Sequence, residues 1–259
     1  ILVSSTGVIG EQIDGKKISS IIQSINNSPK KDLLSASKAI MTTDTYPKTI
    51  IKKIKIGKKR IRLFGIAKGS GMIFPKMGTM LAYFFIEANL SKSVLNKILK
   101  SHLDSSFNSI TVDGDTSTSD TVMLFSLSDS SEKKITNLSV LKNISSVIKK
   151  AMHELALQIV CDGEGISKLM KVRVINAKTF KQASSIAFSI ANSQLVKTSI
   201  AGQDANWGRL IAAIGKSQSS IDQNKIKINY GNNLVAKNGR INKKINLKKL
   251  DKYMKNKTI

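Results

Sequence analysis

Cysteine, histidine, proline and aromatic residues are scarce in this 259-residue chain, and each scarcity excludes a class of protein. A single cysteine, Cys161, excludes an intrachain disulfide and fits a reducing compartment. No apolar run reaches the ~18 residues of a membrane-spanning helix, and the start of the chain does not resemble a signal peptide. The sequence therefore predicts a cytoplasmic protein with no membrane partner.

The rare metal-ligating side chains do not form a metal site in the sequence. His102 and His153 stand far apart, and neither has a second ligand at the spacing that a zinc site uses. Cys161 follows an apolar stretch that is typical of the end of a buried helix, where a thiol usually serves packing. We therefore predict no metal, and a packing role for Cys161.

Acidic residues are also few, with 17 Asp and Glu against 42 Lys and Arg, which gives a formal net charge of +25. Such a charge suggests a nucleic-acid partner. However, the basic residues are 37 lysines and only 5 arginines, spread along the chain, and aromatic residues make up 5%. Phosphate recognition favours arginine and single-strand binding favours interleaved aromatics, so we expect solvated lysine-rich faces and no nucleic-acid partner. A lysine-rich nucleic-acid-binding protein stays open as an alternative.

What the sequence does contain is an alternation of helical and strand patterns, which predicts an α/β protein. A boundary near residue 166 divides it into a larger domain over 1–165 and a smaller α/β domain over 166–259. Expected helices cover residues 17–27, 31–41, 91–103, 136–160, 178–193, 205–214 and 243–257. Expected strands cover 49–56 and 60–66, which pair as a hairpin, then 79–88, 110–112, 121–127, 170–176, 195–199 and 225–229.

The segment from Lys68 to Leu81 carries the clearest chemical signal. A glycine-rich turn with a lysine is followed by Gly78 and Thr79 at the start of an apolar run. Cleavage of the Gly78–Thr79 peptide bond would free an α-amino group on Thr79 with a pKa near ~8, which can act as general base for the threonine hydroxyl. Threonine after glycine is also ordinary at the start of a strand. This segment therefore supports a nucleophile only in combination with the other polar segments of the chain.

Further polar segments that carry glycine or lie in turns punctuate the predicted elements. Thr6-Gly7 offers a hydroxyl and a close-approaching N–H that could stabilise an oxyanion. Thr45 lies in a polar turn, Lys68 can hold a carboxylate, and Glu164 between two glycines suits an ammonium group. Each segment could equally be a simple turn, and the acidic residues between 113 and 120 could serve as turn and capping residues.

Taken in chain order, six segments resemble the ornithine acetyltransferase family, the bifunctional glutamate N-acetyltransferases of arginine biosynthesis. The resemblance extends from residue 4 to about residue 240. It rests on Ser-Thr-Gly-Val-Ile-Gly at 5–10, Ile-Met-Thr-Thr-Asp-Thr at 40–45, Ala-Lys-Gly-Ser-Gly-Met-Ile at 67–73, Val-Asp-Gly-Asp-Thr-Ser-Thr at 112–118, Asp-Gly-Glu-Gly at 162–165 and Asp-Ala-Asn-Trp-Gly-Arg at 204–209.

The resemblance implies a self-cleaving N-terminal-nucleophile enzyme with a layered αββα-type sandwich and a smaller C-terminal domain. Cleavage before the threonine would give α and β chains, assembled as an α2β2 heterotetramer, and an acetyl group would pass from N-acetylornithine to glutamate through that threonine. No cofactor is implied, although acetyl-CoA is a candidate co-substrate. The matching positions are Thr79 as nucleophile, Gly78 and Thr79 at the cleavage site, Thr6 and Gly7 for the oxyanion, and Thr45, Lys68 and Glu164 for substrate.

Two departures and one alternative accompany the resemblance. Gly78 stands where the family usually has alanine, and Ser119 where it usually has asparagine. The family also has further residues at both ends, so we expect this chain to be an internal piece. A related N-terminal-nucleophile amidase or aminopeptidase, which passes the acyl group to water, stays open. An amino-acid substrate with a carboxylate and an ammonium group would need both Lys68 and Glu164.

Overall fold

The computed structural model describes residues 2–25, 32–74, 80–116, 119–129, 131–217 and 219–259. Contacts divide the chain into two compact units. The first holds residues 1–110 and 115–164, and the second holds residues 111–114 and 165–259. Within the described residues, no helix combines the length and the apolar character that crossing a membrane requires.

A four-stranded sheet is the framework of the first unit. Its strands lie in the order β1 (Lys48–Ile56), β2 (Lys59–Lys68), β3 (Leu81–Ile86) and β4 (Thr121–Ser126). β1 and β2 form an antiparallel hairpin, whose two-residue turn begins at Gly57 with φ +57°, a conformation that glycine adopts at little cost. β3 is antiparallel to β2 and parallel to β4. A parallel neighbour requires a crossover, which α3 (Lys92–Leu103) supplies.

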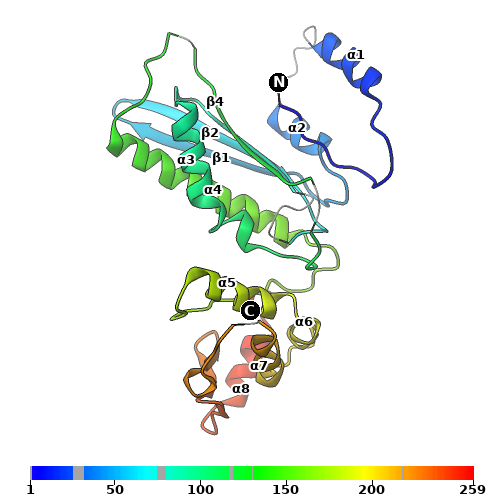
Figure 1. Cartoon of the computed structure of the whole chain (residues 1–259), viewed down its shortest axis with the longest axis vertical. Coiled ribbons are helices and arrows are strands. Elements are labelled where there is room, and N and C mark those ends of the chain that lie inside the picture. Colours follow the sequence, from blue (N-terminus) through cyan, green and yellow to red (C-terminus); the bar gives the residue numbers. More distant parts are fainter. Residues whose placement is uncertain (1, 26–31, 75–79, 117–118, 130, 218) are drawn as a thin grey trace. The chain divides into compact units, whose positions relative to one another are not determined.

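One face of this sheet packs against α4 (Leu138–Cys161), as Figure 1 shows. Ile50, Ile54, Ile61 and Leu63 alternate along β1 and β2 with more exposed residues, and these four side chains are buried. The period of two places such residues on one face, where the apolar side of α4 covers them. α4 also contacts α3 and the short 3-10 helix η1 (Phe107–Ser109).

Two shorter helices precede the sheet. α2 (Leu33–Ala39) begins after Asp32, whose carboxylate accepts the N–H groups of the first turn, and it contacts β1 and β2. α1 (Gly15–Ile25) contains no buried residue. Its isoleucines recur at helical spacing but all are exposed: Ile18, Ile21, Ile22 and Ile25.

The described residues of the second unit form four α-helices, a 3-10 helix and a small sheet. These are α5 (Phe180–Ala191), α6 (Gln194–Ala201), α7 (Trp207–Gly215), η2 (Gln223–Lys225), β5 (Lys227–Tyr230), β6 (Asn233–Lys237), β7 (Arg240–Ile241) and α8 (Leu247–Met254). The three strands are antiparallel. Val196 and Met254 are fully buried in the core that the helices and strands share. Residues 111–114 belong to this unit because Lys197 Nζ donates to the Val112 carbonyl at 2.8 Å and Thr111 Oγ1 to Asn192 Oδ1 at 2.7 Å.

Most predicted elements of the first unit are present within a few residues of their expected bounds. The hairpin of β1 and β2, the apolar strand β3, the strand β4 and the long helix α4 are confirmed. Ser91 caps α3 as expected, since its hydroxyl accepts the N–H of Val94. Strong periodicity and clear capping residues made these elements predictable.

Three predicted strands are wrong. Residues 195–199 lie in α6, because Ser193 caps a helix and Val196 and Ile200 recur at helical spacing on its buried side. Residues 110–112 form no strand. Residues 170–176 form no strand, although Met170, Val172 and Val174 pack on the core. Beside them, Leu169 and Lys171 form backbone hydrogen bonds with residues 257–259 around an isolated parallel bridge between Leu169 and Thr258. The alternation therefore indicated which side chains face the core, and not a strand.

The predicted packing role of Cys161 is also wrong. Cys161 is the last residue of α4, as the sequence suggested, but it is exposed. The helix ends here because Asp162 caps it, and the last turn directs the thiol away from the core that Ile159 and Val160 occupy.

The close fit between β2 and α4 yields the first testable prediction. A Cβ built on Gly65 would lie 2.8 Å from Ile50, 2.9 Å from Leu155 and 3.0 Å from Phe84. Because these side chains are buried and cannot all move aside, we expect Gly65→Ala to lower the free energy of unfolding by ~1–3 kcal/mol in denaturant titrations. Gly15→Ala, which meets nothing within 4 Å, is the control. Equal stability of the two variants would show that the sheet and α4 are not packed this tightly.

Candidate active site

Polar segments from five parts of the first unit meet at one end of its sheet. Here β1 begins, β2 ends, β3 and β4 begin, and α4 ends (Figure 1). The register requires this meeting, because Lys48 lies opposite Ala67, Lys68 opposite Leu81, and Leu81 opposite Thr121. Four of the predicted segments therefore contribute residues to one place although they are far apart in the chain. The hydrogen-bonded residues Thr45 and Asp162, for example, are 117 positions apart.

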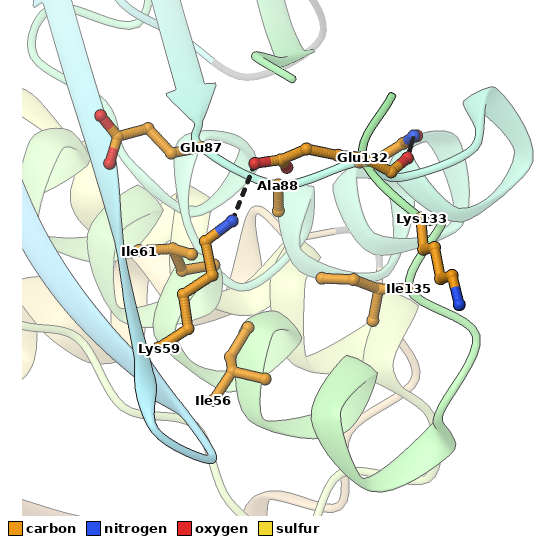
Figure 2. Close-up of a pocket in the computed structure, with 9 residues that line it drawn as sticks. Ile56, Lys59, Ile61, Glu87, Ala88, Glu132, Lys133 and Ile135 are labelled. Carbon is orange, nitrogen blue, oxygen red and sulfur yellow. Dashed lines mark hydrogen bonds and ion pairs between the residues drawn. The ribbon is translucent and has the colours of Figure 1, made fainter. Parts of the chain in front are cut away.

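The opposite end of the sheet has a pocket of about 230 Å³ with a different character. Its floor is apolar, and Figure 2 shows Lys59 at its rim ion-paired with Glu132 at 2.8 Å. Glu87, also at the rim, is paired with Arg62 at 2.5 Å. None of the described residues that the sequence predicted for the site lines this pocket, so we place the candidate site at the other end.

Lys48 is the centre of the polar cluster. Its Nζ lies 2.5 Å from Asp44 Oδ1 and 2.6 Å from Asp162 Oδ2, and its side chain is completely buried. The ammonium group also lies 4.9 Å from the centroid of the Tyr46 ring. A buried cation is tolerated only when it is paired, and here two carboxylates from distant segments pair with it. Lys48 thus joins the turn before β1 to the end of α4.

Asp44 extends this junction to β2. Its Oδ1 accepts the Gly69 N–H at 2.7 Å, and its Oδ2 accepts the Thr42 N–H at 3.2 Å. Burial by itself would raise the pKa of Asp44, but hydrogen bonds from Lys48, Gly69 and Thr42 outweigh burial and hold the pKa below its usual value. The carboxylate is therefore ionised at neutral pH and fixes the turn that follows β2.

Asp162 fixes the predicted substrate residue Thr45. The Asp162 carboxylate accepts the Thr45 N–H at 2.9 Å and also the Thr45 hydroxyl. Burial opposes ionisation, yet hydrogen bonds from Lys48 and Thr45 keep the pKa of Asp162 below its usual value. Thr45 itself is exposed, so its backbone is held while its surface faces solvent.

Lys68 lies on the other face of the sheet from Lys48. Side chains alternate along a strand, and Lys48 shares its face with Ala67, the residue before Lys68. Lys68 is only 1% exposed, and its Nζ donates to Thr42 Oγ1 at 2.7 Å. Burial lowers the pKa of Lys68, while the charges of Asp44 and Asp120 oppose that shift. This lysine differs from the solvated lysines that dominate the chain, because its ammonium group is largely desolvated.

Glu164 stands beside the glycine-rich turn after β2. Its N–H donates to the Ser70 carbonyl at 3.0 Å, and its carboxylate lies so close to Gly71 that a Cβ there would be 2.6 Å from Oε1. Glycine at position 71 therefore makes room for this carboxylate. Ser70 and Thr43 share a hydroxyl–hydroxyl hydrogen bond of 2.6 Å, which connects the turn back to the Asp44 segment. Glu164 is exposed and accessible to a ligand.

Asp120 holds the start of β3. Its Oδ1 accepts the N–H of Met80 at 2.6 Å, and the next residue, Thr121, donates its N–H to the Met80 carbonyl at 3.0 Å. Burial raises the pKa of Asp120 to about 6, although the Met80 N–H and the charge of Lys68 act in the opposite direction. Asp120 was expected only as a turn or capping residue, and the structure gives it a contact next to the predicted nucleophile.

The predicted site residues fall into three groups. Thr45 and Lys68 are joined by hydrogen bonds that run through Asp162, Lys48, Asp44 and Thr42. Glu164 is bonded to Ser70, which bonds to Thr43 in the same turn as Thr42 and Asp44. Gly78 and Thr79 lie outside the residues that the structure describes, so the nucleophile and the cleavage site stay predictions.

Thr6 and Gly7 form the third group and lie in a non-regular segment ahead of α1. Thr6 is half-buried and Gly7 is exposed. Two residues earlier, the Ser4 hydroxyl forms a hydrogen bond with the Tyr83 hydroxyl on β3. This contact brings the segment to the strand that begins just after Thr79, but the oxyanion role of Thr6 and Gly7 stays a prediction.

Sequence reasoning missed Lys48 and the joint role of Asp44 and Asp162. Asp44 and Lys48 are four residues apart on either side of a polar turn, which is a weak signal of pairing. Nothing in the sequence distinguished Lys48 from 36 other lysines. Its importance follows from burial, which local sequence does not reveal.

The buried cluster yields the second prediction. Lys48→Met removes the cation between two carboxylates whose side chains are 0% and 3% exposed. We expect a loss of about 3–5 kcal/mol in the free energy of unfolding at pH 7, because two buried charges are left uncompensated. Lys52→Met is the matched control on the same face of β1, since its pair with Glu154 is partly exposed and should cost at most ~1 kcal/mol.

The pH dependence of this loss tests its cause. In the wild-type protein the pKa values of Asp44 and Asp162 lie below 3.8, so their contribution is present above that pH and is lost as the pH falls through the folded values. Without Lys48, burial should raise both pKa values, and the variant should lose less stability relative to wild type at pH 4 than at pH 7. Urea titrations at both values measure this difference, and an equal loss at both would contradict an electrostatic origin.

Comparison with known proteins identifies the family. The ArgJ family model matches residues 1–259. The chain is 45% identical to the arginine biosynthesis bifunctional protein ArgJ of Bartonella henselae over 262 residues, covering all of this chain and 64% of that protein. It is 43% identical to the ArgJ protein of Bradyrhizobium diazoefficiens over 245 residues, covering 92% of this chain and 59% of that protein. The chain thus spans about three fifths of the length of these relatives.

A solved structure agrees with the sequence comparisons. The crystal structure of the arginine biosynthesis bifunctional protein ArgJ from Bacillus halodurans matches with a TM-score of 0.60 and 35% identity. The match covers 68% of this chain and 83% of that chain. The α/β class predicted from the sequence is confirmed, and so is the predicted family. The polar residues gathered at one end of the sheet are thus part of a protein that belongs to the ArgJ family.

Proposed function

We propose that the full-length protein transfers an acetyl group from N-acetylornithine to glutamate, and so acts as a glutamate N-acetyltransferase. The observation that carries this proposal is that Lys68, a desolvated cation, and Glu164, an accessible carboxylate, are both held against the segment 42–44 at one end of the sheet. Lys68 bonds to Thr42 directly, and Glu164 is connected to Thr43 through Ser70. Both substrates are amino acids that carry groups of the complementary charges. Membership of the ArgJ family, whose relatives are named as bifunctional proteins of arginine biosynthesis, supports the same activity.

In this proposal Lys68 binds the substrate carboxylate. Burial lowers the pKa of Lys68, because it removes the hydration of the charged ammonium group. A bound carboxylate would compensate for this loss by supplying an opposite charge, so an additional anionic partner is favourable. Glu164 binds an ammonium group, with Gly71 leaving space at its side. Thr45, whose backbone is fixed by Asp162, contributes a polar contact at the edge of the same network.

The chemistry proceeds in two stages. In the first, the Thr79 hydroxyl attacks the Gly78 carbonyl, the peptide nitrogen leaves as the new α-amine, and water hydrolyses the ester to give two chains. In the second, that amine takes the hydroxyl proton as Thr79 attacks the acetyl carbonyl of N-acetylornithine, and ornithine leaves with the proton. The amine of glutamate then attacks the acetyl ester and regenerates Thr79. Thr6 and Gly7 donate to the oxyanion in each step.

The finer features of the whole protein follow from this mechanism as proposals. The two chains stay together, and an α2β2 heterotetramer is the assembly that we expect. Small amino acids are the substrates, a cytoplasmic location is expected, and the reaction requires no cofactor. Acetyl-CoA remains a candidate second acetyl donor.

The third prediction tests the nucleophile. In the full-length protein, Thr79→Ala should remain a single chain and carry no acetyl group, because it lacks the hydroxyl that attacks in both stages. Intact mass spectrometry before and after addition of N-acetylornithine measures both outcomes. Thr79→Ser, which retains a hydroxyl, is the control and should still be cleaved. A Thr79→Ala protein that is split at this bond would remove Thr79 from the mechanism.

Product analysis of the wild-type reaction separates acetyl transfer from hydrolysis. Wild-type protein given N-acetylornithine and glutamate should accumulate N-acetylglutamate in amounts equal to the ornithine released. If acetate appears in place of N-acetylglutamate, the protein is an amidase of related mechanism and the transferase proposal is wrong.

The fourth prediction tests charge recognition by Glu164. Glu164→Gln should lower kcat/KM for N-acetylornithine by roughly tenfold to a hundredfold, since a charge-assisted contact contributes about 1.5–3 kcal/mol. An acetylated amino acid with an uncharged side chain should be affected much less. Glu154→Gln, a partly exposed glutamate on α4, is the control. Equal losses on both substrates would show that Glu164 does not bind the ammonium group.

A further inference from the structure

The start of β3 is held from three sides at Met80, the residue that follows Thr79. Asp120 accepts the Met80 N–H at 2.6 Å, and the Thr121 N–H donates to the Met80 carbonyl at 3.0 Å. A Cβ on Gly69 would lie 3.7 Å from the Met80 Cα, so the turn after β2 passes close to the same residue. Met80 is only 5% exposed. Its backbone therefore has little freedom.

The contact with Asp120 replaces part of a strand ladder. β3 and β4 are parallel and begin opposite each other at Leu81 and Thr121, so the register continued backward would oppose Met80 and Asp120. The ladder between β3 and β4 begins at Leu81 and Thr121, and one residue before it the Asp120 side chain accepts the Met80 N–H. The backbone of β3 is therefore fixed one residue beyond the ladder. Asp120 is half-buried and its side chain is short. Its carboxylate can therefore accept this hydrogen bond only when the Met80 peptide lies in a narrow range of orientations.

We propose that Asp120 is a positioning residue for the nucleophile, acting through the peptide bond that links Thr79 to Met80. The inference rests on the function proposed above, because it gives Thr79 the role of nucleophile. Thr79 is joined to the Met80 nitrogen by a planar peptide bond, so a contact that holds the Met80 N–H limits how the residue bonded to it can turn. In this role Asp120 acts through the backbone of Met80.

Asp120 also interacts electrostatically with Lys68. The Lys68 charge favours the ionised form of Asp120, and Asp120 in turn favours the charged form of Lys68. The residue proposed to bind the substrate carboxylate and the residue proposed to orient the nucleophile are therefore coupled electrostatically. Substitutions at Asp120 must distinguish loss of the hydrogen-bond acceptor from loss of the charge.

The fifth prediction uses variants that separate these two properties. Asp120→Asn keeps an oxygen acceptor in the same position and removes the charge, whereas Asp120→Ala removes both. In the full-length protein we expect Asp120→Ala to slow self-cleavage and to lower kcat by roughly tenfold to a hundredfold, the effect of a misplaced reacting group, while KM changes little. Asp120→Asn should restore most of the rate. Asp129→Ala, an exposed aspartate after β4, is the control.

The measurements are self-cleavage followed by intact mass spectrometry after cell-free synthesis, steady-state kcat and KM, and hydrogen exchange at the Met80 amide. Exchange should be slow in wild type and Asp120→Asn and fast in Asp120→Ala. If Asp120→Ala does not fold, Asp120→Glu replaces it, because the longer side chain displaces the acceptor and should be impaired while Asp120→Asn is not.

Two results would overturn the inference, and a third would overturn the proposed function instead. Self-cleavage and kcat of Asp120→Ala equal to wild type would show that the contact does not position Thr79. Asp120→Asn as impaired as Asp120→Ala would show that the charge matters and the acceptor does not. A wild-type protein that cleaves itself but transfers no acetyl group would contradict the acetyltransferase, while the cleavage and exchange rates would still decide the role of Asp120.

Discussion

The polar end of the sheet depends on one buried cation, the ammonium group of Lys48. Burying a lysine costs free energy, and the two carboxylates that surround it would also be unfavourable without it. The cluster is therefore a weak source of net stability but a strong constraint on geometry, because the three charges tolerate only arrangements in which all are paired. The turn before β1, the turn after β2 and the end of α4 must meet for that condition to hold.

This constraint separates a buried framework from accessible groups that are proposed to bind substrate. Asp44, Lys48 and Asp162 are buried and already satisfied by each other and by backbone N–H groups. Thr45 and Glu164 are exposed on top of that framework. Binding groups supported by a shell with locked hydrogen bonds keep their positions when a ligand arrives, which reduces the free energy lost on ordering them. Asp120 applies the same principle at the start of β3, where it holds a backbone amide instead of another charge.

The parts of the fold that the sequence predicted share strong local signals. The hairpin of β1 and β2 has alternating apolar residues around a glycine turn, and α3 has a serine cap. The failures have weak local signals and a tertiary cause. Residues 195–199 are predicted as a strand, yet they lie in α6, which buries Val196 in the second core and leaves Leu195 exposed. Cys161 was expected to be buried because the residues before it are, but the end of the helix exposes it.

The family, which the comparisons confirm, was predictable from the residues alone, and so were a proposed chemistry and its candidate residues. These depend on short segments whose residue types have direct chemical uses. The tertiary structure was needed to show which of those residues are connected by hydrogen bonds and that Lys48 is the lysine paired with two buried carboxylates. Lys48 has no distinguishing neighbours in a chain with 37 lysines, whereas Lys68 is marked by the glycine-rich turn that follows it. The burial that separates both from the other lysines is not visible in the sequence. Burial and charge pairing depend on the register of the sheet and on where α4 ends, so they are set by contacts between segments that are distant in the chain.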